Sequence, residues 1–185
     1  MTTPVNREKS NIEYSYHNSQ AGHHHRYLLP PLLKFITEEC SSETSKLRIL
    51  DLGCGNGSLS HKIAEQGHEV IGVEESASGI QVARESYHNC TFIQGSIYNF
   101  PFEEVGNSFD LVVSAEVIEH LFSPRELPRV AKKILKPNGS LIITTPYHGY
   151  LKNLALALSG RMDKHFTTLW DGGHIKFFSI KSLRQ

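Results

Sequence analysis

Between Lys46 and about residue 146, the hydrophobic and polar positions follow two patterns in turn: short apolar runs, and stretches with the spacing of a helix. Short apolar runs predict strands at 47–52, 68–74, 91–95, 109–116 and 140–146. The stretches between them carry helical spacing and predict helices at 57–66, 77–88 and 124–135, the last closed by Pro137-Asn138-Gly139. This alternation predicts an α/β fold, a doubly wound and mostly parallel sheet with helices on both faces.

The flanking regions follow other patterns. Residues 1–30 form an N-terminal arm that we expect to be loose over its first twenty residues, and residues 31–185 form a single domain. Leu32 to Cys40 predicts an amphipathic helix with Pro31 in its first turn. The three histidines His23 to His25 could be a metal or substrate feature, but a solvated loop before this helix is the favoured interpretation.

Three glycines follow the first predicted strand at every second position, Gly53, Gly55 and Gly57, with Asp51 just before them. Glycine clusters of this kind mark a tight turn or a close approach of the backbone to a ligand. In an open parallel sheet, ligands bind outside the carboxyl ends of the strands, where the next helix offers free N–H groups. The spacing differs from the dinucleotide fingerprint G-x-G-x-x-G, because Ser58 stands where its third glycine would be.

The glycine turn reads D-x-G-x-G-x-G, and two further stretches accompany it, FDLVVSAEVIEHL at 109–121 and LKPNGSLIITTP at 135–146. Together they resemble the class I S-adenosylmethionine-dependent methyltransferases, most closely the ubiquinone-biosynthesis O-methyltransferases. The resemblance covers about residues 45–146, with a weaker tail to 182. Asn138 replaces a glycine of the family, which an asparagine can do because it tolerates the left-handed conformation. The resemblance implies a Rossmann-like fold and methyl transfer from S-adenosyl-L-methionine, with an oxygen of a small molecule as the preferred acceptor.

The resemblance also implies where the cofactor binds. Glu74 ends the second predicted strand, where an acid accepts hydrogen bonds from both ribose hydroxyls; capping of the next helix is the alternative, although Ser76 suits that role better. Asp51 and the Gly53 carbonyl could take the cofactor's amine, and Arg26 its carboxylate unless Arg26 is only a solvated loop residue. The full set of expected cofactor-binding residues is Arg26, Asp51, Gly53, Cys54, Gly55, Glu74, Ser96, Ile97 and Ala115. Ser96 and Ile97 stand where the family often has an acid facing the adenine.

The stretch EVIEH raises a separate question. Glu116, Glu119 and His120 would share one face if the segment were helical, and His174 comes from a later loop. The resemblance implies that these four residues could hold Mg²⁺ or Mn²⁺, with the imidazoles favouring Mn²⁺. The alternative is a packing role beside the cofactor. Without a metal, His120 or His174 could be the general base.

The segment 147–173 is rich in aromatic and apolar residues and follows the fifth predicted strand at the catalytic end of the sheet. This position favours a substrate lid with a helix at Leu151–Ser159, and His148 and Tyr150 would then point near the substrate. The alternative is a segment that only packs on the sheet edge. Ser179 predicts the N-cap of one further helix, and we expect the natural protein to continue for several tens of residues.

The composition of the chain limits which partners and which cellular location are expected. Lys plus Arg and Asp plus Glu both total 19, so the formal net charge of zero weighs against broad nucleic-acid binding and against the metal-assisted RNA 2′-O-methyltransferase alternative. The chain has no apolar run long enough to span a bilayer and no signal-peptide core, and its three cysteines suggest neither disulfides nor zinc, so a cytoplasmic location is expected. A nicotinamide-dependent reductase and a catalytically silent cofactor-binding module remain as alternatives. The sequence leaves the methyl acceptor and the oligomeric state open.

Overall fold

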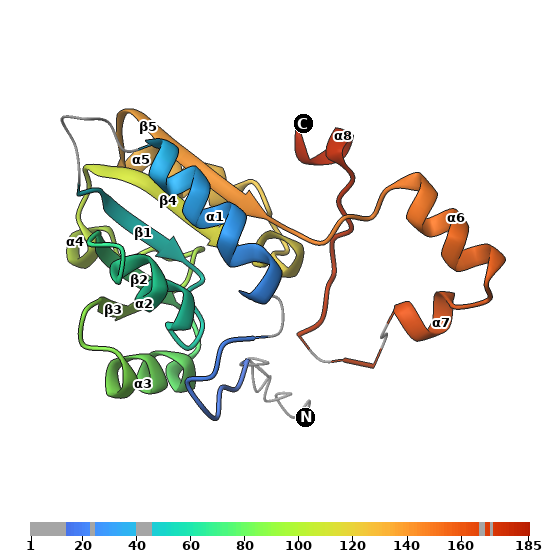
Figure 1. Ribbon diagram of the computed structural model, residues 1–185, viewed down its shortest axis with the longest axis horizontal. Coiled ribbons are helices and arrows are strands. Elements are labelled where there is room, and N and C mark those ends of the chain that lie inside the picture. Colours follow the sequence, from blue (N-terminus) through green and yellow to red (C-terminus); the bar gives the residue numbers. More distant parts are fainter. Residues whose placement is uncertain (1–13, 23–24, 40–45, 167–168, 171) are drawn as a thin grey trace, which may run out of the picture.

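The architecture was derived from a computed structural model, which describes residues 14–22, 25–39, 46–166, 169–170 and 172–185. Five parallel strands form one sheet in the order β3-β2-β1-β4-β5 (Figure 1). The strands are β1 (Arg48–Leu52), β2 (Glu69–Glu74), β3 (Thr91–Gln94), β4 (Phe109–Ala115) and β5 (Leu135–Thr144). The order reverses direction at β1, so the carboxyl ends of β1 and β4 form the topological switch point.

Helices cover both faces of the sheet, as a doubly wound fold requires. The helices among the described residues are α1 (His25–Glu39), α2 (Ser58–Ala64), α3 (Ala77–Ser86), α4 (Phe102–Val105), η1 (Ile118–His120) and α5 (Glu126–Ile134), followed after β5 by α6 (Tyr150–Leu158), α7 (Met162–His165) and α8 (Ile180–Leu183). On one face, Leu32 and Ile36 of α1 and Ile63 of α2 are buried against β1 and β4. On the other face, Leu127 and Ile134 of α5 are buried. The predicted fold class is confirmed.

The helix predicted at Leu32–Cys40 begins earlier than expected, at His25, and contains both Pro30 and Pro31. The two prolines lie just beyond the first turn, so they remove only the hydrogen bonds to the carbonyls of Arg26 and Tyr27. Burial of Leu32 and Ile36 at 2% and 1% exposure stabilises the helix in spite of that loss. His23 and His24 lie outside the described residues, and His25 begins the helix.

The strand expected at 140–146 begins at Leu135 and includes the Pro-Asn-Gly sequence that was predicted to close the preceding helix. Leu135 pairs with Phe109 and Ser140 pairs with Leu111, so the residues between them bulge out of the ladder. Asn138 is left-handed there, with φ of 66°. Pro137 is tolerated because β5 lies at the edge of the sheet as described.

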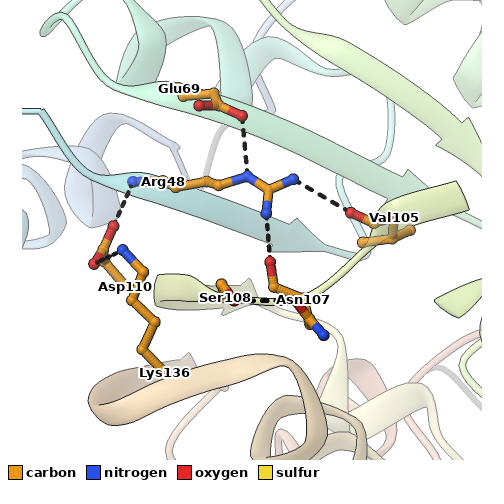
Figure 2. A network of polar contacts seen from close by, with 7 residues as sticks. All are labelled: Arg48, Glu69, Val105, Asn107, Ser108, Asp110 and Lys136. Carbon is orange, nitrogen blue, oxygen red and sulfur yellow. Dashed lines mark hydrogen bonds and ion pairs between the residues drawn. The ribbon is translucent and has the colours of Figure 1, made fainter. Parts of the chain in front are cut away.

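The amino ends of the strands are joined by a polar network around Arg48 (Figure 2). Its guanidinium Nε donates to Glu69 at 3.0 Å, and its terminal nitrogens donate to the carbonyls of Asn107 and Val105. Its main-chain N–H donates to Asp110, which Lys136 also contacts at 2.6 Å. This network lies at the opposite end of the sheet from the switch point and therefore has a structural role.

After β5 the chain leaves the sheet, and Figure 1 shows α6 and α7 standing away from it. None of the residues of α6 is buried, and Leu151 and Leu158 are 74% and 81% exposed. The helix expected at Leu151–Ser159 is therefore present, but its apolar face is exposed. Ser179 caps α8, as expected. Among the helices described, none combines the length and apolar content needed to cross a membrane.

Candidate functional site

The glycine turn leaves the carboxyl end of β1 at the switch point. Gly53, Gly55 and Gly57 all have positive φ, at 84°, 55° and 79°. The side chain of Val117 packs directly on Gly53, where an added Cβ would lie 2.4 Å from a Val117 methyl carbon. The turn is tied to β2 because the N–H groups of Gly53 and Cys54 both donate to the Val73 carbonyl. The conformation therefore requires glycine, as the spacing predicted.

Glu74 lies at the carboxyl end of β2 beside this turn. One carboxylate oxygen accepts the Gly55 N–H at 3.0 Å and the other accepts the Ser76 N–H at 2.9 Å. Burial raises the pKa of the Glu74 carboxyl, and these two hydrogen bonds oppose the rise. Each oxygen keeps acceptor capacity for a hydroxyl group. The cap of α3 is Ser76, whose side chain accepts from Gly79 N–H.

Asp51 is buried beneath the turn. Its Oδ2 atom accepts the hydroxyl of Ser60 at 2.6 Å, while Oδ1 is buried without a hydrogen-bond partner in the described part of the chain. Burial raises the pKa of this carboxyl to about 6, the Ser60 hydrogen bond lowers it, and the charge of Glu74 adds to the rise. A buried carboxylate with one free oxygen is a suitable acceptor for an ammonium group.

The other expected cofactor residues are placed as follows. The Cys54 side chain packs in the core with Phe92, and its sulfur also contacts the Gly55 carbonyl at 4.0 Å. Ser96 pairs with Asn99 in an isolated bridge after β3, Ile97 is buried in the core, and Ala115 ends β4 partly buried. Arg26 is exposed on the first turn of α1. Their roles toward a cofactor stay predictions.

Glu116, Glu119 and His120 do not share one helical face, because the segment is not helical at Glu116, which was the condition for that arrangement. The Glu116 N–H bonds to Thr144 of β5, which extends the sheet pairing, and Glu116 then adopts a left-handed φ of 58°. Its carboxylate accepts the Thr144 hydroxyl at 3.0 Å. Only Ile118–His120 is helical, as a single 3₁₀ turn. Glu116 is consequently outside the cluster that its neighbours form.

That cluster joins Glu119, His120 and His174, whose ligand atoms lie within 4.8 Å of one another. Glu119 has 0% exposure, and neither of its carboxylate oxygens makes a hydrogen bond of good geometry among the described residues. Burial raises the pKa of Glu119 to about 7 and the charge of Glu116 adds to the rise, while its own main-chain N–H and the Thr145 hydroxyl oppose it. The nearest imidazole nitrogen, Nε2 of His174, is 3.9 Å from Glu119 Oε1.

Hydrogen bonds orient His120 within the cluster. Its Nδ1 atom lies 2.8 Å from the carbonyl of Gly172 and 3.2 Å from that of Gly173. Because a carbonyl only accepts, Nδ1 carries the proton in the neutral ring and Nε2 keeps its lone pair. The same loop is anchored by the N–H groups of Ile175 and Lys176, which donate to the Glu119 carbonyl. Burial, with His120 nearby, lowers the pKa of His174.

The segment 147–173 reaches the cluster through its last part. Trp170 lies beside His120 and His174, with ring centroids at 6.2 Å and 5.7 Å. His148 instead packs among His165, Phe166 and Phe177, where burial lowers its pKa to about 4. Tyr150 is 77% exposed. A lid function of this segment stays a prediction.

Tyr14 and Tyr16 lie at the site although nothing in the sequence pattern predicted them there. Both lie on the arm that was expected to be loose, yet residues 14–20 are hydrogen-bonded across the glycine turn and α3. The only signal was a pair of aromatic residues within a polar stretch, and nothing in their spacing specifies what they contact.

Comparisons with known proteins agree with the geometry. A family model described as a methyltransferase domain matches residues 43–173. The ubiquinone biosynthesis O-methyltransferase of Pasteurella multocida (strain Pm70) is 32% identical over 145 residues, covering 72% of the chain and 59% of that relative. The enzyme of the same name from Azorhizobium caulinodans is 35% identical over 118 residues, covering 62% and 46%. The chain thus spans about half the length of these curated relatives.

Solved structures show the same fold. The YcgJ protein from Bacillus subtilis superposes with a TM-score of 0.64 at 24% identity, covering 88% of the chain and 65% of that protein. The PH0226 protein from Pyrococcus horikoshii OT3 gives a TM-score of 0.55 at 32% identity, covering 74% and 61%. The resemblance described from the motifs is confirmed.

Proposed function

The chain belongs to the methyltransferase-domain family, and we propose that it transfers the methyl group of S-adenosylmethionine to a hydroxyl oxygen of a small molecule. The observation that carries the proposal is the pairing of Glu74 with the glycine turn at the switch point. Glu74 would accept the ribose hydroxyls, the main chain of the glycine turn would lie against the cofactor, and the Asp51 oxygen that has no partner among the described residues would accept a hydrogen bond from its amine.

The chemistry asks little else of the protein. The sulfonium makes the methyl group electrophilic, so the protein has to hold the acceptor in line with it and receive the acceptor's proton. The cluster of Glu119, His120 and His174 follows β4, which lies next to β1 at the switch point. We infer that the cluster lies near the acceptor; without a bound metal, the Nε2 lone pair of His120 would be available to a hydroxyl proton.

Oxygen on a small molecule is supported by two observations. The curated relatives named above are O-methyltransferases, and the net charge of zero offers no general attraction for a polyanion. Both observations concern the class of acceptor only.

We also propose that the cluster holds a divalent cation, with Mn²⁺ favoured over Mg²⁺ because two of its three donors are imidazoles. The residues fit such an ion. The buried Glu119 oxygens make no hydrogen bond of good geometry among the described residues, so a cation would stabilise their charge. The Nδ1 hydrogen bonds of His120 direct its Nε2 lone pair away from the loop. A bound ion would supply Lewis-acid lowering of the acceptor hydroxyl's pKa.

The proposed reaction is tested by transfer of a labelled methyl group to a panel of acceptors. Catechols, phenols and aliphatic alcohols represent small hydroxyl compounds, and amines and a short RNA represent the competing classes. We expect label only in a hydroxyl compound, lost in Glu74→Ala. Label in RNA or amines would contradict the acceptor class, and cofactor binding without transfer to any acceptor would favour a silent module.

The metal is tested by calorimetric titration of Mn²⁺ into protein that has been treated with EDTA and dialysed. We expect binding in the wild type, loss in Glu119→Gln, and retention in the control Glu116→Gln, because Glu116 lies outside the cluster. Equal binding by wild type and Glu119→Gln would contradict the site. Methyl transfer that persists fully in EDTA would show that the reaction needs no metal, and would favour His120 as the general base.

A further inference from the structure

Residues 14–20, here called the arm segment, cross the glycine turn and are held at three places, by the turn and by both ends of α3. The Asn56 side-chain amide, in the turn itself, donates to the carbonyls of Asn18 and Gln20, both at 2.9 Å. Ser76, before α3, donates to the Tyr14 carbonyl at 2.5 Å. At the far end of α3, the Tyr87 hydroxyl donates to the Ser19 carbonyl at 2.6 Å. The arm segment is therefore positioned mainly by its backbone, so the rings of Tyr14 and Tyr16 can contact the site.

Tyr16 uses this position to cover the turn. A Cβ added at Gly55 would lie 2.7 Å from the Tyr16 hydroxyl oxygen, and one added at Gly79 would lie 3.0 Å from the Tyr16 ring. The Tyr16 N–H donates to the Ser78 hydroxyl at 3.0 Å, which fixes the residue over α3. Burial raises the pKa of the phenol, and the charge of Glu74 adds to the rise, so the ring stays neutral beside the residue proposed to bind ribose.

The Tyr14 ring lies between Tyr16 and the cluster of Glu119, His120 and His174. Its ring is 5.3 Å from that of Tyr16, 6.3 Å from that of His120 and 6.4 Å from that of Trp170. His120 belongs to the cluster at which the acceptor is proposed to bind. Two residues of the arm segment thus contact the two halves of the site.

We propose that Tyr16 is a cofactor-binding residue and that Tyr14 transmits occupancy of the cofactor site to His120 and Trp170. The arm segment is then the element through which the cofactor prepares the acceptor site. This inference rests on the proposed function, because it assumes that the glycine turn binds S-adenosylmethionine.

The test is calorimetric titration of S-adenosylhomocysteine into the wild type, Tyr16→Ala, Tyr16→Phe and Phe35→Ala. Phe35 is the matched control, an aromatic residue that is 54% exposed on α1. We expect Tyr16→Ala to weaken binding by about tenfold, since the ring covering the turn is lost. Tyr16→Phe keeps the ring and is expected to remain within about threefold of the wild type, which also shows that position 16 tolerates substitution without unfolding.

The second readout is fluorescence. Trp170 is the chain's one tryptophan, so its emission reports on the contact with Tyr14. We expect S-adenosylhomocysteine to change this emission in the wild type and not in Tyr14→Ala. The same emission change in Tyr14→Ala would overturn the transmission role.

The outcomes separate this inference from the proposed function. No binding by folded wild-type protein would overturn both. Binding by the wild type that is equal or tighter in Tyr16→Ala would overturn the inference alone, because the arm segment would then be a bystander or a plug. A loss in Tyr16→Phe as large as that in Tyr16→Ala would contradict the role of the ring.

Discussion

Replacing Asp51 with asparagine should stabilise the protein while weakening its cofactor site. The side chain is 1% exposed, and its pKa is raised from 3.8 to about 6, first by burial. A shift of about two units corresponds to roughly 3 kcal/mol. Because the folded state binds this proton more tightly than the unfolded state, the free energy of unfolding falls as pH rises from about 4 to about 6. At pH 8 the whole penalty is present in the wild type and absent in Asp51→Asn.

The assay is thermal and urea unfolding at pH 4 and pH 8. At pH 8 we expect Asp51→Asn to gain up to about 3 kcal/mol, or roughly 6–12 °C in Tm for a chain of this size, with the gain nearly absent at pH 4. Ser60→Ala is the matched control with the opposite sign, because its hydroxyl stabilises the charged carboxylate at 2.6 Å. It should lose roughly 1–2 kcal/mol at pH 8. An asparagine variant that is less stable than the wild type at pH 8 would refute the reasoning.

Two other substitutions test which residues contribute to stability alone and which belong to the glycine turn. Gly57→Ala should destabilise the protein by roughly 1–3 kcal/mol in urea unfolding, because φ is 79° and the new Cβ would lie 2.7 Å from the Phe92 ring; unchanged stability would mean that the turn does not need its conformation. Arg48→Ala should cost roughly 1–3 kcal/mol through the lost network of Figure 2, yet leave S-adenosylhomocysteine affinity within about twofold, as calorimetry can check. A large loss of affinity in Arg48→Ala would show that the two ends of the sheet are coupled.

Much of the fold could be predicted because local and tertiary preferences agree. The glycine spacing predicted a turn that the structure builds with three positive φ angles, and the position of Glu74 after the second apolar run placed it beside that turn. Buried strands such as β4 gave an unambiguous apolar run. In each case one residue type satisfies both the local geometry and the packing.

The features that the sequence pattern did not predict depend on contacts between residues far apart in the chain. EVIEH has helical spacing, but pairing of Glu116 with Thr144 keeps it at the sheet and leaves a single 3₁₀ turn. Helix α1 includes two prolines because burial against the sheet outweighs two lost hydrogen bonds. The contact of Tyr16 with Gly55 and Gly79 joins residues far apart in the chain, and no periodic pattern encodes it.

The most direct measurement is calorimetric titration of S-adenosylhomocysteine into the wild type, Glu74→Ala and the control Glu75→Ala. Glu75 is the exposed neighbour of Glu74 and lies outside the turn contacts. The proposed cofactor site predicts micromolar binding by the wild type and by Glu75→Ala, and a loss of at least about tenfold in Glu74→Ala, since the ribose hydroxyls would lose their acceptor. No binding by the folded wild type, or equal binding by Glu74→Ala, would contradict the assignment of the glycine turn and Glu74 as the cofactor site.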